Sequence, residues 1–230
     1  MNNSYVKTRD RLERYFDRTA SKTWEVLTSD LPVSGIRARV RSGRVKMRNI
    51  LLSSLPSNLT GVRVLDAGCG TGQITFELAR RGADVVGVDI SKNLINVAKD
   101  RMPSNLSPKI QFEIGDMLSG EYGNFDYVVA MDSLIHYDAE DISIALEQLA
   151  KSTIRSISFS IAPKTAFLSS MLILGKLLPQ SDRSPRIAPV SLEALNLCLK
   201  SRDILKNSQA RTLRRVRASF YVSEALIIGS

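Results

Sequence analysis

The chain has 230 residues, 43% of them hydrophobic, and a net charge of +9, which fits one α/β domain with a modest insertion or cap. Cys69 and Cys198 form no CxxC pair, so the zinc and redox motifs built on such pairs are excluded and a reducing compartment is expected. The polar N-terminus predicts no signal peptide, and the longest apolar run, residues 166–178, is too short to span a bilayer.

The positive charge is unevenly placed along the chain. Residues 1–60 carry 12 Lys and Arg against 5 Asp and Glu, and residues 200–217 carry 7 against 1. Residues 61–199, between these flanks, carry 13 against 16. Basic flanks around a slightly acidic centre fit three kinds of partner: nucleic acid, an anionic membrane surface or an anionic small substrate.

Residues 1–30 are predicted to form one or two short helices. Leu12, Tyr15 and Phe16 share one face at helical spacing. Two interpretations stay open for this face. Its aromatic side chains are either part of the core or part of an N-terminal arm that closes over a ligand.

Residues 34–55 carry two neighbouring stripes at helical spacing. The apolar stripe runs from Ile36 to Leu55, and the basic stripe consists of Arg37, Arg41, Arg44 and Arg48. A basic stripe is either a solvated helix face or a row of guanidinium groups that receives carboxylates, because the guanidinium fork matches a carboxylate bidentately.

The stretch over residues 62–79 dominates the interpretation. Strand-forming residues run into Asp66, a Gly-x-Gly-x-Gly turn follows at residues 68–72, and a helical pattern begins at Gln73. This order is typical of the first βα unit of a nucleotide-binding sheet. A dinucleotide fingerprint would need glycine in place of Gln73. Asp66 would also repel a diphosphate, whereas it suits a ligand with an ammonium group.

Strands and helices then alternate up to residue 161, which implies right-handed crossovers and a parallel sheet. After the first unit, strands are expected at 85–91, 110–117 (with its loop), 125–132 and 153–161, and helices at 92–101 and 139–151. The later segments predict helices at 167–178 and 190–199 and a hairpin of 210–217 with 219–228. We therefore expect a helical arm or cap at 1–60, a Rossmann-like core at 61–162, a lid insertion at 163–200 and a closing hairpin at 201–230.

The sequence Val-Leu-Asp-Ala-Gly-Cys-Gly-Thr-Gly at residues 64–72 resembles motif I of the class I S-adenosylmethionine-dependent methyltransferases. The resemblance implies a Rossmann-like, seven-stranded, mostly parallel sheet and S-adenosylmethionine as the cofactor, with S-adenosylhomocysteine as its product. Asp89, which lies 21 positions after Gly68, stands where a carboxylate holds the ribose. The cofactor-binding residues that follow are Asp66, Gly68, Gly70, Asp89, Ile90, Asp116, Met117 and Met131, with Asp116 at the adenine amino group.

The block before motif I resembles that of the magnesium-protoporphyrin IX O-methyltransferases in their purple-bacterial form. The likeness rests on Tyr-Phe-Asp-Arg-Thr-Ala at residues 15–20, on Trp24 and on residues 31–37 and 41–44, and the end of the chain at 217–226 is also similar. It implies that a methyl ester forms on one propionate of a magnesium porphyrin in bacteriochlorophyll biosynthesis. The magnesium is part of that substrate, and no metal site of the protein is expected.

Such a reaction needs little base catalysis. A propionate has a pKa near that of Glu, about 4.3, so it is ionised at pH 7 and the enzyme has mainly to align it with the methyl group. We expect Arg37, Arg41 and Arg44 to bind the substrate carboxylate. Tyr137 is a further substrate-binding candidate.

His136 is the only histidine, and it follows the fourth predicted strand. A single histidine is often a structural group, but this position lies beside the methyl donor in the resembled family. We expect His136 to orient the propionate or to ligate the magnesium axially, and not to remove a proton. Tyr15 is the second catalytic candidate and would help to close the pocket.

Other functions stay open at this point. In a quinone or phenol O-methyltransferase His136 would be a true base. An RNA methyltransferase fits the pI of about 9.8, although residues 132–135 lack the usual aromatic-proline tetrapeptide, so nucleic acid is not an expected partner. A non-enzymatic nucleotide-binding protein is the third alternative. We expect a cytoplasmic location, while peripheral contact with an anionic photosynthetic membrane and handover from a magnesium chelatase subunit stay open.

Overall fold

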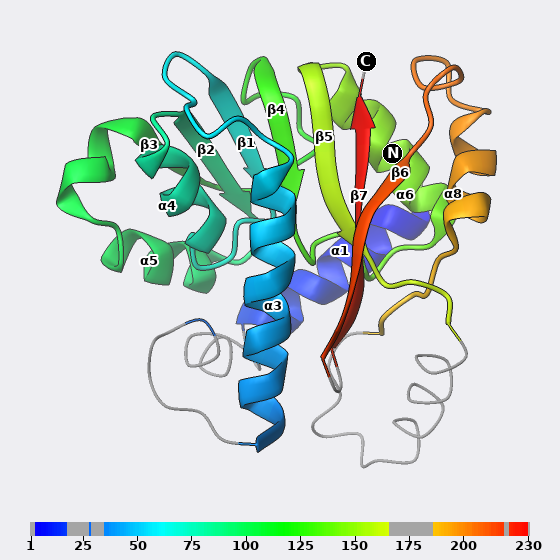
Figure 1. Ribbon diagram of the computed structural model, residues 1–230, viewed down its shortest axis with the longest axis horizontal. Coiled ribbons are helices and arrows are strands. Elements are labelled where there is room, and N and C mark those ends of the chain that lie inside the picture. Colours follow the sequence, from blue (N-terminus) through cyan, green and yellow to red (C-terminus); the bar gives the residue numbers. More distant parts are fainter. Residues whose placement is uncertain (1–2, 18–27, 29–34, 166–185, 219–220, 230) are drawn as a thin grey trace.

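The computed structural model describes residues 3–17, 28, 35–165, 186–218 and 221–229. Its centre is a seven-stranded sheet with the order β3-β2-β1-β4-β5-β7-β6 (Figure 1). The strands are β1 (Arg63–Ala67), β2 (Asp84–Asp89), β3 (Ile110–Ile114), β4 (Phe125–Ala130), β5 (Thr153–Ile161), β6 (Arg211–Ala218) and β7 (Tyr221–Gly229). The first five strands pair in parallel, and β7 runs antiparallel to both β5 and β6. The predicted seven-stranded, mostly parallel sheet is confirmed.

The helices also follow the predicted order, with small shifts at their ends. They are α1 (Asn3–Tyr15), α3 (Gly35–Ser53), α4 (Gln73–Arg80), α5 (Lys92–Asp100), the 3-10 helix η2 (Ser104–Lys109), α6 (Ala139–Ala150) and α8 (Leu192–Leu199). Ser91 begins α5 by accepting a hydrogen bond from the Leu94 amide on its side chain, as expected for a helix N-cap. The helix predicted at 167–178 lies outside the described residues.

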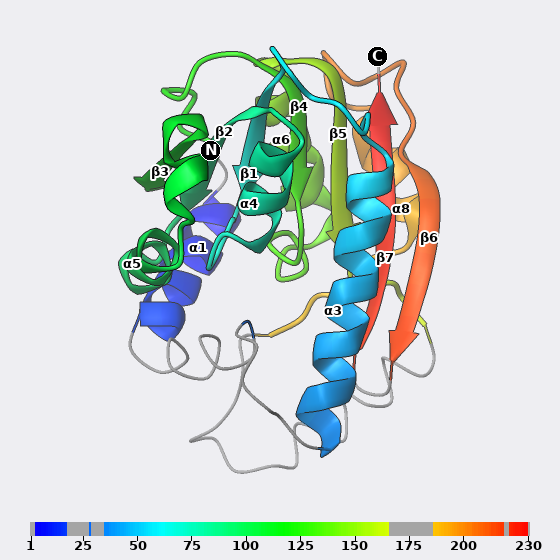
Figure 2. The same cartoon turned by 60° about the vertical axis from the view of Figure 1, so that its left-hand side comes forward.

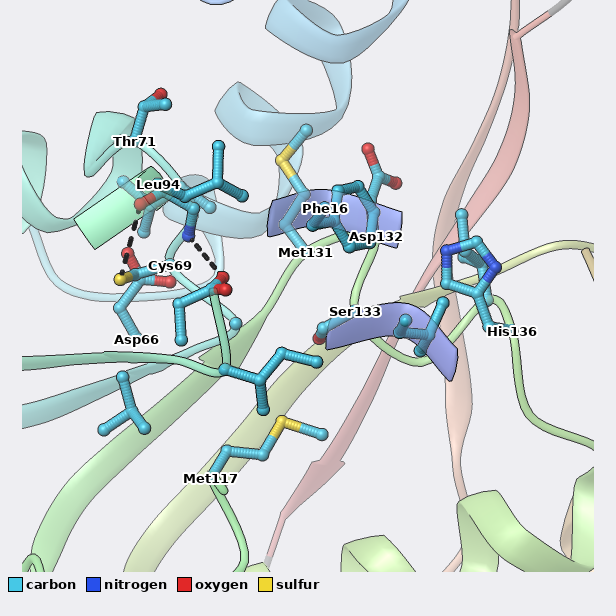
Figure 3. Close-up of a pocket in the computed structure, with 18 of the residues that line it drawn as sticks. Phe16, Asp66, Cys69, Thr71, Leu94, Met117, Met131, Asp132, Ser133 and His136 are labelled. Carbon is cyan, nitrogen blue, oxygen red and sulfur yellow. Dashed lines mark hydrogen bonds between the residues drawn. The ribbon is translucent and has the colours of Figure 1, made fainter. Parts of the chain in front are cut away.

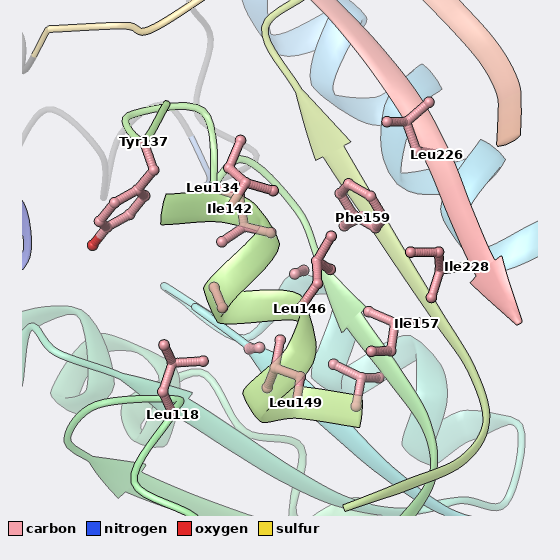
Figure 4. Packing of buried hydrophobic residues seen from close by; sticks show 14 of the residues in the cluster. Leu118, Leu134, Tyr137, Ile142, Leu146, Leu149, Ile157, Phe159, Leu226 and Ile228 are labelled. Atoms are coloured by element: carbon pink, nitrogen blue, oxygen red, sulfur yellow. The ribbon is translucent and has the colours of Figure 1, made fainter. Parts of the chain in front are cut away.

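The helices form two layers, one on each face of the sheet. Helices α3, α4 and α5 share one buried apolar cluster, and α1, α6 and α8 share the other (Figure 2). Adjacent strand residues divide between the two clusters, since successive side chains of a strand point to opposite faces: Val64 packs in the first and Leu65 in the second. Figure 4 shows the second cluster, where Leu146 of α6 lies over Ile157 and Phe159 of β5.

Helix α8 falls within the segment predicted as a lid, residues 163–200. Its Leu195 and Leu199 are fully buried in the cluster that also holds α6. The helix therefore belongs to the core layer rather than to a lid. The rest of the predicted lid includes residues 166–185, which lie outside the described part of the chain.

Helix α3 places the apolar stripe only partly as predicted. Met47, Leu51 and Leu55 are buried against the sheet, but Ile36 is 53% exposed. The reason is visible in Figure 1, where the N-terminal half of α3 extends beyond the ends of the strands. That half of the helix instead extends past the edge of the sheet that holds the carboxyl ends of strands β1 to β5.

No helix among the described residues is long and apolar enough to cross a membrane. Within the same residues there is no cluster of three or more His, Cys, Asp or Glu side chains that could hold a metal ion.

Candidate active site

A cavity of about 360 Å³ opens at the carboxyl ends of β1, β2 and β4. Elements from distant parts of the sequence line it, including α1, α3 and the start of β7. All the predicted cofactor residues line this cavity, namely Asp66, Gly68, Gly70, Asp89, Ile90, Asp116, Met117 and Met131. Figure 3 shows Asp66 and Cys69 at one end of the cavity and His136 at the other, with Met131 and Asp132 between them.

Asp66 is the penultimate residue of β1 and is 1% exposed. Its Oδ2 accepts a hydrogen bond of 2.6 Å from the Thr75 hydroxyl on α4. Burial raises the pKa of Asp66 to about 7, although the bonds from Thr75 partly oppose this shift. A cation placed beside this carboxylate would therefore stabilise its ionised form, which burial disfavours.

Asp89 ends β2 in a similar environment. One carboxylate oxygen accepts the Gly70 amide at 2.8 Å, and the other accepts the Ser91 amide at 2.9 Å. Burial raises the pKa of Asp89 to about 6. These two bonds tie the glycine turn of β1 to the end of β2, so the two loops form one rigid wall of the cavity.

The glycine turn packs closely against the loop after β4. Gly68 has φ +80°, and a Cβ on it would lie 2.5 Å from the Ser133 Cβ. Two hydroxyls of this wall, Thr71 Oγ1 and Ser133 Oγ, are buried and make no hydrogen bond within the described part of the chain. Buried polar atoms in proteins are normally paired, so a ligand with polar groups fits here. The amine, carboxylate and ribose of S-adenosylmethionine match these acids and hydroxyls.

Asp116, predicted at the adenine amino group, is already engaged by the N-terminal helix. Its Oδ1 accepts the Tyr5 hydroxyl at 2.8 Å and the Leu118 amide at 2.9 Å. Its Oδ2 pairs with the Arg9 guanidinium at 3.0 Å. Helix α1 therefore closes the cavity next to Asp116, and the adenine role of this carboxylate stays a prediction.

Asp132, two residues after the end of β4, organises the other end of the cavity. Its Oδ2 pairs with Arg44 of α3, and its Oδ1 accepts the Tyr221 hydroxyl of β7 at 3.0 Å. It is the one non-glycine residue with positive φ, 57°, in the described segments. This conformation costs about 1 kcal/mol, which the surrounding hydrogen bonds offset.

The predicted arginine row divides at this end. Arg44 and the neighbouring Arg48 line the cavity. Arg37 is exposed and Arg41 is partly buried, and neither lines the cavity as the described residues form it. The side chains lie one and two turns further from the sheet, on the part of α3 that extends beyond the strands.

His136 lies at the far rim of the cavity, and its ring makes an edge contact with Phe16. Its Nδ1 is 3.1 Å from the carbonyl oxygen of Arg186. A carbonyl oxygen can only accept a hydrogen bond, so Nδ1 carries the proton of the ring and donates a hydrogen bond to this oxygen. Burial lowers the pKa of the ring, which therefore stays neutral at pH 7 and keeps a lone pair on Nε2.

Tyr15 and Tyr137 both line the cavity. Tyr137 is 3% exposed, and its ring stacks on that of Tyr5 with centroids 4.9 Å apart. Burial raises the pKa of the Tyr137 hydroxyl above its usual range. Tyr137 is thus a neutral side chain that joins α1 to the loop after β4, beside the predicted catalytic residues.

Comparisons with known proteins identify the family. The chain is 52% identical over 227 residues to the magnesium-protoporphyrin O-methyltransferase of Rhodobacter capsulatus, which covers 98% of both chains. The chain belongs to the magnesium-protoporphyrin O-methyltransferase family. A model of the C-terminal part of magnesium-protoporphyrin IX methyltransferases matches residues 130–229, and a general methyltransferase domain model matches residues 64–153.

Two further relatives agree with this assignment. The magnesium-protoporphyrin O-methyltransferase of Synechocystis is 30% identical over 192 residues, which is 81% of this chain and 82% of that one. A crystal structure of the magnesium protoporphyrin IX methyltransferase from Synechocystis PCC 6803 with bound SAH superposes with a TM-score of 0.80 at 27% identity. That match covers 96% of this chain and 98% of the other.

Sequence reasoning missed three side chains that the fold brings to the cavity: Tyr5, Arg9 and Tyr221. Arg48 belongs to the predicted basic stripe, and Asp132 follows Met131 at the end of the fourth strand, but the pairing of Asp132 with Arg44 was not predicted. Tyr221 and Tyr5 carried no signal in the sequence, because each reaches the cavity through pairings between distant elements.

Proposed function

We propose that this member of the family transfers the methyl group of S-adenosylmethionine to a propionate carboxylate of magnesium-protoporphyrin IX and so forms the monomethyl ester. The observation that carries the proposal is the 52% identity, over nearly the whole chain, with the Rhodobacter capsulatus magnesium-protoporphyrin O-methyltransferase. The division of the cavity supports it, since buried acids suit a cationic methyl donor and arginines suit an anionic acceptor.

The cofactor would lie against the β1 and β2 loops. Asp66 would face its ammonium group, Asp89 its ribose hydroxyls, and Gly68 and Gly70 would let the backbone pass close to it. When bound, S-adenosylmethionine supplies an electrophilic methyl group on a sulfonium. Met117 and Ile90 would give apolar contacts at the adenine side, and Met131 would lie toward the acceptor.

The acceptor needs alignment more than activation. A propionate is ionised at pH 7 and is itself the nucleophile, so the protein has to desolvate it and keep it in line. Arg44 supports this task best among the predicted arginines because it lines the cavity, and Arg48 joins it. Arg37 and Arg41 would act further out, on the porphyrin periphery.

The protonation of His136 favours one of its two predicted roles. With Nδ1 donating to the Arg186 carbonyl, Nε2 holds a lone pair and cannot donate a hydrogen bond to a carboxylate. Histidines that ligate metals commonly donate a hydrogen bond from the N–H of their second ring nitrogen to a backbone carbonyl in this way. We therefore favour axial ligation of the substrate magnesium by His136, with Tyr15 and Tyr137 closing the pocket around the macrocycle.

The decisive experiment incubates the purified protein with methyl-labelled S-adenosylmethionine and either magnesium-protoporphyrin or its metal-free form. Label should enter the magnesium porphyrin as an ester that mild alkali removes. Failure to label it, with cofactor binding intact, would contradict the proposal. A His136→Ala variant in the same assay should lose most of the preference for the magnesium form, because its ligand to the metal is gone.

A phenol O-methyltransferase is the second candidate, favoured by a lone pair on His136 Nε2 that could also accept a proton. Ubiquinone biosynthesis O-methyltransferases match parts of the chain, for example 35% identity over 53% of it. The two candidates differ in pH dependence. With the cofactor saturating, a phenol acceptor requires a neutral base and gives a kcat that falls as His136 is protonated, whereas a carboxylate acceptor gives a kcat that is flat above about pH 6.

The surface charge supports a proposal about partners. Arg211, Arg214, Arg215 and Arg217 of the edge strand β6 are exposed, which suits an acidic protein or an anionic membrane surface. We propose a cytoplasmic protein that receives its porphyrin from a magnesium chelatase subunit at or near such a membrane. Co-sedimentation with anionic and neutral vesicles, and with the chelatase subunits, would test the two contacts separately.

A further inference from the structure

Three elements meet at Asp132 beyond the end of β4. Its backbone amide donates to Ser160 Oγ on β5 at 2.8 Å, and the Ser160 hydroxyl donates back to Oδ1 at 3.2 Å. The Tyr221 hydroxyl donates to the same oxygen, while Oδ2 pairs with the guanidinium of Arg44. The carboxylate is thus held from three sides in one orientation, and this orientation decides where the guanidinium lies.

Close packing of α3 on β7 supports the same arrangement. A Cβ on Gly43 would lie 2.6 Å from Cδ1 of Tyr221 and 3.1 Å from the Cβ of Ala218. A glycine at this point lets the helix approach the strand, so that the next residue, Arg44, reaches Asp132 beneath it. Helix α3, strand β7 and the Asp132 carboxylate therefore meet at one point, although Arg44 and Asp132 are 88 residues apart in the sequence.

The charges at this point explain why a pair is needed. A carboxylate on the acceptor side of the cavity would by itself repel the carboxylate of the substrate. Paired with Arg44, Asp132 loses that effect and instead fixes a long side chain that would otherwise sample many rotamers. A guanidinium that is ordered before binding pays less entropy when the acceptor arrives.

We propose that Asp132 is a positioning residue for the methyl acceptor. Together with the Tyr221 hydroxyl and Ser160, it fixes the guanidinium of Arg44 beside the place where the propionate must lie. It acts through Arg44, without accepting a proton from the substrate. The inference rests on the proposed function, and the alternative is that the pair only fastens α3 to the sheet.

A double-mutant cycle separates these two roles. Asp132→Asn, Arg44→Gln and the double variant are compared for kcat and KM with magnesium-protoporphyrin, for S-adenosylhomocysteine affinity and for Tm. Each single change should lower kcat/KM for the porphyrin by roughly 10- to 100-fold, because each removes a hydrogen bond between charged groups. For Asp132→Asn the loss should fall mainly on kcat, and the double variant should be no worse than Arg44→Gln alone.

Two further variants control for folding. Tyr221→Phe keeps the ring against Gly43 but removes the hydroxyl, and should give a smaller loss of the same kind, about 3- to 10-fold. Glu224→Gln removes a comparable ion pair, that of Glu224 on β7 with Arg215 on β6, which lies outside the cavity. The buried Glu224 carboxylate accepts a hydrogen bond of 2.7 Å from Arg215 Nη2. This variant should lower Tm as Asp132→Asn does and leave kcat/KM within about twofold of wild type.

Several outcomes would overturn the inference. Losses that multiply in the double variant would make Asp132 independent of Arg44. Equal losses of porphyrin turnover and cofactor affinity, in parallel with Tm, would leave only a fastening role. An active wild type with Asp132→Asn unchanged would refute this inference alone, whereas a wild type that methylates no magnesium porphyrin would overturn the proposed function as well.

Discussion

The two ends of the cavity are built in different ways. The cofactor end is formed by loops that follow β1 and β2, so that Asp66, Gly68, Gly70 and Asp89 lie within a short stretch of sequence. The acceptor end is assembled from α3, the loop after β4 and the start of β7, through Arg44, Asp132 and Tyr221. Local sequence thus fixes one end, whereas long-range pairing fixes the other.

Their electrostatics differ in the same way. At the cofactor end two buried acids have raised pKa values and no cation beside them in the described structure, so a bound cation would complete them. At the acceptor end the acid Asp132 already has its cation, Arg44. The first end is ready for a positive ligand. At the second end Arg44 neutralises Asp132 in advance, so that this acid does not repel the carboxylate of the acceptor.

The largest expected effect comes from filling the cofactor end. Gly68→Ala would place a Cβ 2.5 Å from that of Ser133, on a backbone with φ +80°. Gly68 and Ser133 both line the cavity, so relieving the collision would shift the wall that holds the cofactor, and S-adenosylhomocysteine affinity should drop by at least about 100-fold, measured by calorimetry.

Gly120→Ala is the matched control for this change. Gly120 also has positive φ, 75°, but nothing lies within 4 Å of its added Cβ. It should cost about 1 kcal/mol of unfolding free energy through strain alone and leave cofactor affinity unchanged. Equal affinity losses in the two variants would mean that strain, and not the collision, decides the effect.

The next largest effect tests the acceptor end. His136→Ala removes Nε2 from the rim of the cavity and should lower kcat/KM for magnesium-protoporphyrin by roughly 10- to 100-fold, the range found when a metal contact is weakened. S-adenosylhomocysteine affinity should stay within about twofold, since the ring lies at the far end from Asp66. A loss of kcat/KM smaller than threefold would exclude both roles assigned to this histidine.

A third prediction uses pH to address the cofactor end alone. The pKa of Asp66 is about 7 in the folded protein, above the usual value of about 3.9, so the carboxyl takes up a proton as pH falls through 7. An ammonium ligand prefers the ionised form. Affinity for S-adenosylhomocysteine should therefore fall about tenfold from pH 8 to pH 6, and Asp89, with a pKa of about 6, should extend the fall below that.

Stability should respond with the opposite sign. Because the folded state binds the proton more tightly than the unfolded state, protonation of Asp66 favours folding as pH falls from about 7 toward 4. The free protein should gain thermal stability from this group over the range in which the cofactor-induced rise in Tm shrinks. Asp66→Asn should flatten both curves, and an unchanged pH dependence in that variant would assign it to other groups.

This contrast also shows what the sequence could predict. Motif I and the strand after it gave the cofactor end, because each side chain is placed by its own strand and turn. The pairing of Asp132 with Arg44 and Tyr221 escaped because contacts between distant elements leave no local pattern in the sequence. Ile36 lies on the apolar stripe of α3 but is exposed, since helical spacing gives a face but not the length over which the sheet covers it.

The smallest expected effect concerns the outer arginines of α3 and sharpens the boundary of the acceptor end. Arg37 is exposed and does not line the cavity as the described residues form it, whereas Arg44, two turns along the same stripe, does. Exposed charges are screened by solvent and salt, so Arg37→Gln should change KM for the porphyrin by about twofold or less, and the change should vanish at high salt. Arg44→Gln in the same assay should keep its larger loss at high salt, because its charge is partly buried beside Asp132. If Arg37→Gln equalled Arg44→Gln, the propionate would have to lie outside the cavity, and the acceptor end would extend along the whole helix.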